Sequence, residues 1–155
     1  MIYKCKHFGI KELVSRKVYN AFIKYGEAFI WGFFDAEILQ DVDLIRETWG
    51  KPIIINDWAF GGSLEQCGLR SNIEQLTKDH TAKGVPYLGG HNLAKGFDFH
   101  DKAGDNKGLY EHICNLARQG RLKKLRRVEN IASTPTWVHA DGLQIVADKL
   151  QIFYV

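Results

Sequence analysis

Three side chains of the kinds that bind zinc stand out by their spacing. His91 is followed seven residues later by Asp98, and His139 lies much further along in a Trp-Val-His-Ala-Asp run. Catalytic zinc sites use three protein ligands of this kind and leave a fourth position for water. These three residues would supply such a set, and the small residues between the first two would let the chain turn tightly. A His and an Asp at this spacing also occur without a metal, so the pattern alone leaves both interpretations open.

The segment around His91 and Asp98 resembles a family signature. In the zinc D-Ala-D-Ala carboxypeptidase and dipeptidase superfamily, which has the Hedgehog/DD-peptidase fold, the pattern is Ser-x-His-x-x-Gly-x-Ala-x-Asp. His91 and Asp98 match its two metal positions in spacing. Ala94 and Gly96 occupy its small-residue positions with their identities exchanged, and Gly89 replaces the Ser. The resemblance implies that His91 and Asp98 are zinc ligands.

Two further segments agree with this resemblance in their order along the chain. Residues 137–141 are similar to the phage and cell-wall branch of the superfamily, in which an aromatic-Val-His-x-Asp run carries the third ligand, here His139. Residues 68–71 resemble a Gly-Tyr-Arg-Ser element whose Arg lies at the active site, here Arg70. The resemblance extends over most of residues 8–141. The remaining histidines match no ligand spacing: His7, His80, His100 and His112.

The resemblance implies a zinc-dependent peptidase that cleaves peptide bonds of peptidoglycan stem peptides or cross-links. In such an enzyme the zinc ion activates water and polarises the scissile carbonyl, and a carboxylate moves the proton. Arg70 would stabilise the oxyanion or clamp a substrate carboxylate. Without the family, Arg70 is equally well interpreted as a surface residue after a turn.

The expected general base is where the sequence departs from the family pattern. Many members have an acidic residue three positions before the last His, but Thr136 stands there and has no carboxylate. Asp141 is the best substitute, because residues two apart on a strand share a face; its other interpretation is a partner that orients His139. Glu129 is a more distant candidate. The alternative function is therefore a zinc-binding module that serves binding or assembly without catalysis.

Hydrophobic spacing predicts the elements that must position these residues. Apolar residues at helical spacing predict a helix over residues 35–49, with Asp35 as its N-cap and Gly50 at its end. Further helices are predicted over residues 17–29 and 109–125, and a short helix or turn over residues 9–15. Strands are predicted within residues 52–58, 97–100, 127–131, 136–140 and 150–155. This order predicts an α+β fold, a small antiparallel sheet with helices packed on one face.

Composition limits the class of protein. The chain has 155 residues, 45% hydrophobic and 25% charged, which predicts one globular domain over residues 1–155. No segment approaches the ~18 consecutive apolar residues of a membrane helix. The start lacks the features of a secretory signal, so we expect synthesis in the cytoplasm without one. Three widely spaced cysteines exclude a full disulfide framework, and we expect reduced thiols.

The expected partner is a peptidoglycan peptide. The net charge of +3 is small, and no base-reading motif accompanies the basic residues 118–127, so we do not expect nucleic-acid binding. We interpret those residues as a solvated helix tail, with attraction to an anionic wall polymer as a hypothesis.

We expect a monomer. Action on the cell wall would follow release, as for a bacteriophage endolysin that relies on a separate membrane-permeabilising protein, or it would occur from a virion.

Overall fold

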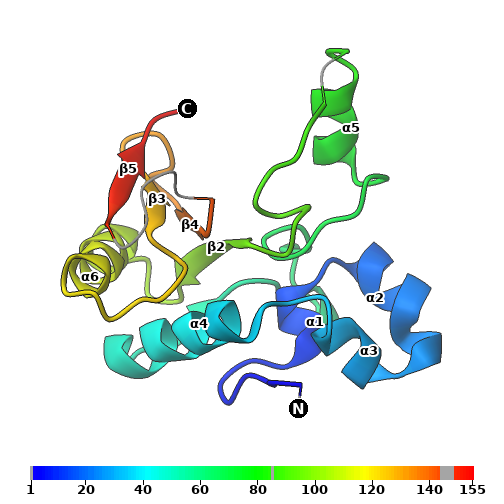
Figure 1. Ribbon diagram of the computed structural model, residues 1–155, viewed down its shortest axis with the longest axis horizontal. Helices are drawn as coiled ribbons and strands as arrows, with labels where there is room; N and C mark the ends of the chain where they lie inside the picture. Colours follow the sequence, from blue (N-terminus) through cyan, green and yellow to red (C-terminus); the bar gives the residue numbers. More distant parts are fainter. Residues whose placement is uncertain (1, 85, 144–148) are drawn as a thin grey trace.

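Five short strands form one mixed sheet in the computed structural model, which describes residues 2–84, 86–143 and 149–155 (Figure 1). The strands are β1 (Ile53–Ile54), β2 (Gly96–Asp101), β3 (Arg127–Glu129), β4 (Val138–Asp141) and β5 (Gln151–Phe153). Their order across the sheet is β1-β2-β4-β3-β5. Helices accompany this sheet, so the predicted α+β class is confirmed.

The prediction that the sheet is antiparallel throughout is wrong at β5. The pairs β1–β2, β2–β4 and β3–β4 are antiparallel, whereas β3 and β5 are parallel, with Arg127 opposite Gln151 and Glu129 opposite Phe153. Strand β5 therefore lies at the outer edge of the sheet, next to β3 and not next to β4. A strand of three residues carries no sequence pattern that states its neighbour or its direction.

The predicted helix over residues 35–49 is confirmed as α4 (Ala36–Trp49). The Asp35 side chain accepts a hydrogen bond from the Glu37 backbone N–H at 2.7 Å, and Gly50 ends the helix in the left-handed conformation, with φ of 73°. The other helical elements are α1 (Ile10–Leu13), α2 (Arg16–Phe22), η1 (Ile23–Tyr25), α3 (Glu27–Trp31), η2 (Trp58–Phe60), α5 (Gln75–Thr81) and α6 (Asn106–Arg118).

The helix predicted over residues 109–125 ends earlier than expected, because α6 stops at Arg118. Gly120, with a φ of 68°, turns the chain away from the helix axis. The Asp41 carboxylate on α4 then accepts backbone N–H bonds from Lys123, Lys124 and Leu125, at 2.6–2.9 Å. The basic residues after Arg118 are thus fixed by α4 as a loop and do not form a helix tail.

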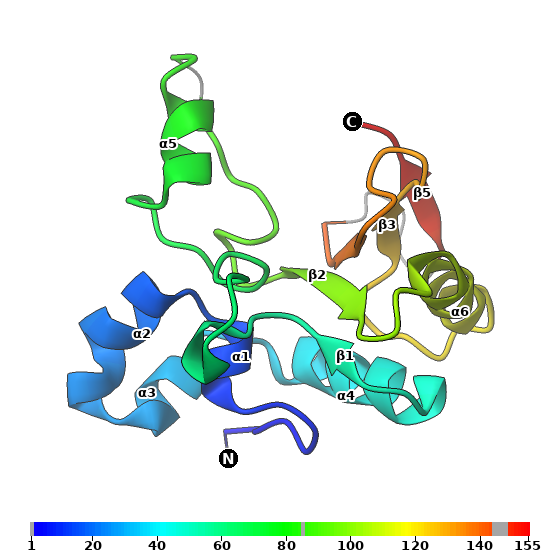
Figure 2. The ribbon, with the colours of Figure 1, turned by 180° about the vertical axis from the view of Figure 1, so that it is seen from behind.

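The main apolar core lies between the sheet and the helices α4 and α6, on the side away from α5 (Figures 1 and 2). Strand alternation sends Phe97 and Phe99 of β2 and Val138 and Ala140 of β4 into this core, where none of them is exposed. Helix α6 packs against both strands. The alternate residues of β2 and β4, including Asp98 and His139, therefore face the opposite side of the sheet.

A projecting segment stands over that opposite side. Residues 71–84 and 86–88, here called the α5 arm, rise from the body opposite β3 and β5 (Figure 1). The buried Glu74 anchors the base of the arm by accepting a hydrogen bond from the Ser15 hydroxyl at 2.6 Å. None of the helices in the described ranges is long and apolar enough to cross a membrane.

Candidate metal centre

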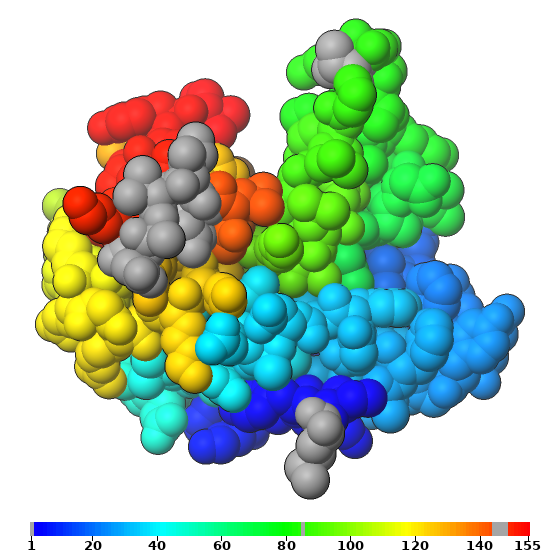
Figure 3. Space-filling model, in the orientation of Figure 1, coloured from blue at the N-terminus to red at the C-terminus, as the bar shows by residue number. Residues whose placement is uncertain are grey.

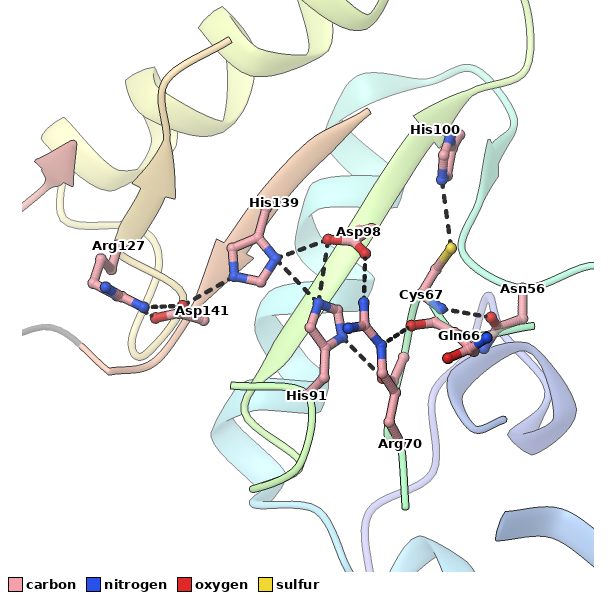
Figure 4. Close-up of polar contacts among 11 residues, drawn as sticks. Asn56, Gln66, Cys67, Arg70, His91, Asp98, His100, Arg127, His139 and Asp141 are labelled. Atoms are coloured by element: carbon pink, nitrogen blue, oxygen red, sulfur yellow. Dashed lines mark hydrogen bonds and ion pairs between the residues drawn. The ribbon is translucent and has the colours of Figure 1, made fainter. Parts of the chain in front are cut away.

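The three predicted ligands come together at one point above the sheet (Figure 4). His139 Nδ1 lies 2.8 Å from Asp98 Oδ1, and His91 Nε2 lies 3.2 Å from His139 Nδ1 and 3.3 Å from Asp98 Oδ1. All three residues are at least nine-tenths buried. Asp98 on β2 and His139 on β4 are opposite each other in the register, and His91 comes from the loop before β2. These side chains could hold one metal ion.

The loop that carries His91 explains the small residues in the sequence motif. The Lys95 N–H donates to the Gly90 carbonyl at 2.8 Å and closes a tight turn. A Cβ on Gly96 would lie 3.0 Å from the Gly90 carbonyl carbon, so a larger residue would push the turn open. Ala94 has a φ of 55°, in the left-handed region that glycine occupies at least cost. At the position where the similar motif has Gly, this chain thus carries an Ala in a conformation that favours Gly.

The second nitrogen of each histidine fixes which nitrogen faces the centre. His91 Nδ1 lies 2.9 Å from the Gly68 carbonyl oxygen, and His139 Nε2 lies 3.0 Å from Asp141 Oδ2. Because these oxygens accept hydrogen bonds, the two nitrogens donate to them. His91 Nε2 and His139 Nδ1 therefore direct lone pairs at Asp98 Oδ1. Three acceptors that converge in this way require a cation or an additional proton, and this chemistry fits a zinc ion.

The charges of the three groups follow from burial and from each other. Burial lowers the pKa of His91. Burial would raise the pKa of Asp98, but the neighbouring His91 and His139 hold it below its ordinary value. Burial would lower the pKa of His139, but its hydrogen bonds to Asp141 and Asp98 raise it to about 9. The directions of these shifts make His139 the more basic of the two histidines.

Arg70 contacts the centre through Asp98. Its Nη2 donates to Asp98 Oδ2 at 3.1 Å, and its Nε donates to the Gln66 carbonyl oxygen. The Arg70 N–H also donates to the His91 carbonyl at 3.1 Å, so this residue ties two of the three candidate ligands together. Because the guanidinium binds Oδ2, the other Asp98 oxygen, Oδ1, faces the histidines. The guanidinium also lines the cavity beside them.

Asp141 lies behind His139 and is fully buried. Arg127 donates to both of its oxygens, from Nε to Oδ1 at 2.8 Å and from Nη2 to Oδ2 at 2.7 Å. His139 and the Leu143 N–H bind the same carboxylate. Burial would raise the pKa of Asp141, but the hydrogen bonds from His139, Arg127 and Leu143 outweigh it and lower this pKa to about 2. This geometry favours the role of orienting His139 over that of a base for water.

Glu129 lies in the cavity over the centre, whereas Thr136 lies outside it. Glu129, on β3, is 9% exposed and lines the same cavity as the three candidate ligands. Burial raises the pKa of its carboxyl. Thr136 is exposed and is absent from the cavity lining. Its carbonyl accepts a hydrogen bond from Asn106 Nδ2 at 2.9 Å, which fixes the loop before β4.

A cavity of about 460 Å³ opens over the centre, between the α5 arm and strands β3 and β5 (Figure 3). On the arm side it is lined by Leu76, His80 and Tyr87, and the last two rings are stacked with centroids 4.1 Å apart. On the strand side it is lined by Trp137 and Phe153. Sequence reasoning missed this arm wall, because no spacing signals residues that only the tertiary fold brings near the centre.

The remaining histidines and cysteines lie outside the ligand set. The His100 ring is next to Cys67, with Nε2 3.6 Å from Sγ, and His112 contacts Thr48 and Trp49. The three cysteines form no disulfide. Burial raises the pKa of Cys67 to about 12, so its thiol is protonated at neutral pH when no metal is bound.

Comparison of the chain with protein-family models, with curated proteins and with solved structures finds no match. The likeness to the zinc peptidase superfamily therefore stays a prediction from sequence motifs. What the centre can do follows from its own side chains and distances.

Proposed function

We propose that the protein is a zinc-dependent peptidase that hydrolyses peptide bonds in peptidoglycan stem peptides or cross-links. One observation carries the proposal: the lone pairs of His91 and His139 and one oxygen of Asp98 converge on a point at the floor of an open cavity. Two imidazoles and a carboxylate are a donor set that suits zinc and leaves a position for water.

The residues of the centre have different roles in the proposed hydrolysis. A bound zinc ion would make water nucleophilic at neutral pH and polarise the carbonyl of the peptide. His91, Asp98 and His139 hold the ion, and Asp141 keeps the His139 ring in the orientation that presents Nδ1. Arg70 adds a cation at the cavity wall, where it stabilises the negative charge that develops on the carbonyl oxygen.

The substrate class rests on the cavity and on the sequence motifs. The space between the α5 arm and the strands is large enough for several residues of an extended peptide, and its walls offer aromatic and apolar contacts. The order His91, Asp98 and His139, with Trp137 before the last ligand, resembles cell-wall peptidases. These two features support a peptide of the bacterial cell wall as substrate.

A zinc-binding module without catalysis is the second candidate function. The absence of a carboxylate at Thr136 and the saturated hydrogen bonding of Asp141 favour it. In this case the same three ligands would hold zinc, and the cavity would bind a peptide without cleaving it.

Digestion of purified peptidoglycan tests the proposal and separates the two candidates. The zinc-loaded protein is incubated with peptidoglycan, and mass spectrometry identifies the soluble fragments. We expect cleaved stem peptides or cross-links from the wild type and from the matched His7→Ala variant, whose histidine is exposed and remote from the centre, and none from His91→Ala. Zinc at about one ion per chain without any released fragment favours the binding module. A wild type that binds no zinc contradicts both functions.

A further inference from the structure

The strand register places one further carboxylate in the row that carries the metal centre. Asp98 on β2 is opposite His139 on β4, and Glu129 on β3 is opposite Phe153 on β5. Between these pairs, β3 and β4 match Arg127 with Asp141 and Val128 with Ala140, so Glu129 follows next to His139. The row across four strands is thus Asp98, His139, Glu129 and Phe153, all on the cavity side of the sheet.

Glu129 is also the carboxylate that the other contacts leave available. The acidic residues lining the cavity are Asp98, Glu129 and Asp141. Asp98 is occupied by the histidines and Arg70, and Asp141 by Arg127 and His139. In the described part of the chain, no hydrogen bond or ion pair engages the side chain of Glu129, although the residue is only 9% exposed. A carboxylate that lines a cavity and has no hydrogen-bond or ion-pair partner is a candidate for ligand binding or proton transfer.

We infer that Glu129 is the proton-transfer residue of the proposed peptidase, in place of the carboxylate missing at Thr136. The inference rests on the proposed function. Arg70 stands on the Asp98 side of the centre and Glu129 on the far side of His139. A peptide carbonyl bound at the centre would therefore lie between a cation and a carboxylate. Such an arrangement separates the group that stabilises the oxyanion from the group that moves the proton.

The proton balance of the step is simple. As the water oxygen forms its bond to the carbonyl carbon, the Glu129 carboxylate takes one proton from that water. The resulting carboxylic acid then gives this proton to the amide nitrogen as the carbon–nitrogen bond breaks. One water is consumed, a carboxyl group and an amine are produced, and Glu129 returns to its ionised form.

The Glu129→Gln variant tests the inference, because the amide keeps the size of the side chain and cannot accept the proton. Its matched control is Glu111→Gln, which changes an exposed glutamate on α6. We expect both variants to fold and to bind zinc at the wild-type ratio. Removal of a general base lowers kcat by about 10²–10⁴-fold, so we expect that loss in Glu129→Gln with little change in KM and none in the control.

Binding of a peptide hydroxamate provides a readout that does not depend on turnover. A hydroxamate gives up its proton to a nearby carboxylate when it binds a zinc site, so we expect roughly 10- to 100-fold weaker binding to Glu129→Gln by calorimetry. Wild-type cleavage together with unchanged kcat and hydroxamate affinity in Glu129→Gln overturns this inference alone. A zinc-loaded wild type that cleaves no peptide overturns the proposed function and, with it, the role of Glu129.

Discussion

The two faces of strands β2, β4 and β3 differ in chemistry although alternate residues of the same segments build them. On the helix side, Phe97, Phe99, Val128, Val138 and Ala140 are fully buried and apolar. On the cavity side, the same strands carry Asp98, His139, Asp141, Arg127 and Glu129. Apolar burial on the first face stabilises the folded state, whereas the desolvation of charged groups on the second face opposes folding.

Apolar packing on the helix side therefore stabilises the sheet, whereas the cavity side carries the candidate metal centre. The charges of the cavity side are compensated in pairs, with Arg70 on Asp98 and Arg127 on Asp141. The convergent lone pairs at the centre are paired with no such cation among the described residues and require a metal ion or an additional proton. Substitutions on the helix face should therefore affect folding first, and substitutions on the cavity face should affect metal binding first.

The largest expected effect is on the helix face. Phe97→Ala removes a fully buried ring that stacks on Phe34, with centroids 5.9 Å apart. We expect it to lower the free energy of unfolding by about 3–5 kcal/mol, as measured by denaturant unfolding. The control Phe60→Ala, at a ring that is 75% exposed, should change it by less than about 0.5 kcal/mol. Equal losses for the two variants would contradict the assignment of the core.

The next largest expected effect is the change in stability when zinc is added to the cavity face or removed from it. Zinc at about a hundredfold excess over its Kd should raise the free energy of unfolding by about 2.7 kcal/mol, because it binds the folded chain. A chelator should reverse the gain, and the His91→Ala variant should show none. Equal stabilisation of wild type and His91→Ala would mean that zinc binds elsewhere.

Asp141→Asn is expected to have a smaller effect on metal binding. The asparagine keeps the shape of the side chain, but it weakens the hydrogen bond that orients His139 and removes the charge that Arg127 contacts, so metal affinity is measured on protein shown to be folded. Loss of such a partner typically weakens metal affinity by about 10–100-fold, which a competing chromophoric chelator can measure. The exposed Asp79→Asn serves as control and should bind zinc like the wild type. An unchanged affinity in Asp141→Asn would remove the orienting role assigned to this carboxylate.

Local signals in the sequence predict several parts of this structure well. The N-cap Asp35 and the left-handed Gly50 set both ends of α4. The spacing of His91 and Asp98 and the small residues between them predict a tight turn, and the structure closes that turn with Lys95 and Gly90. Such features depend on residues within a few positions of one another, so a single sequence contains them.

Features that depend on distant partners could not be predicted in the same way. The parallel pairing of β5 with β3 and the path of residues 123–125 after α6 are fixed by contacts from other elements, among them Asp41 on α4. Strand parity puts Asp141 on the face of His139, but Arg127 from β3 decides that its carboxylate is held behind the ring. The place of Glu129 in the ligand row likewise needs the register of three strand pairs.

The central claim is that His91, Asp98 and His139 bind one zinc ion, and anomalous diffraction at the zinc absorption edge tests it most directly. In crystals of the zinc-loaded protein we expect one strong anomalous peak, about 2.0–2.2 Å from His91 Nε2, His139 Nδ1 and an Asp98 oxygen. Absence of a peak at this position, or a peak bound by other side chains such as Cys67, would contradict the account.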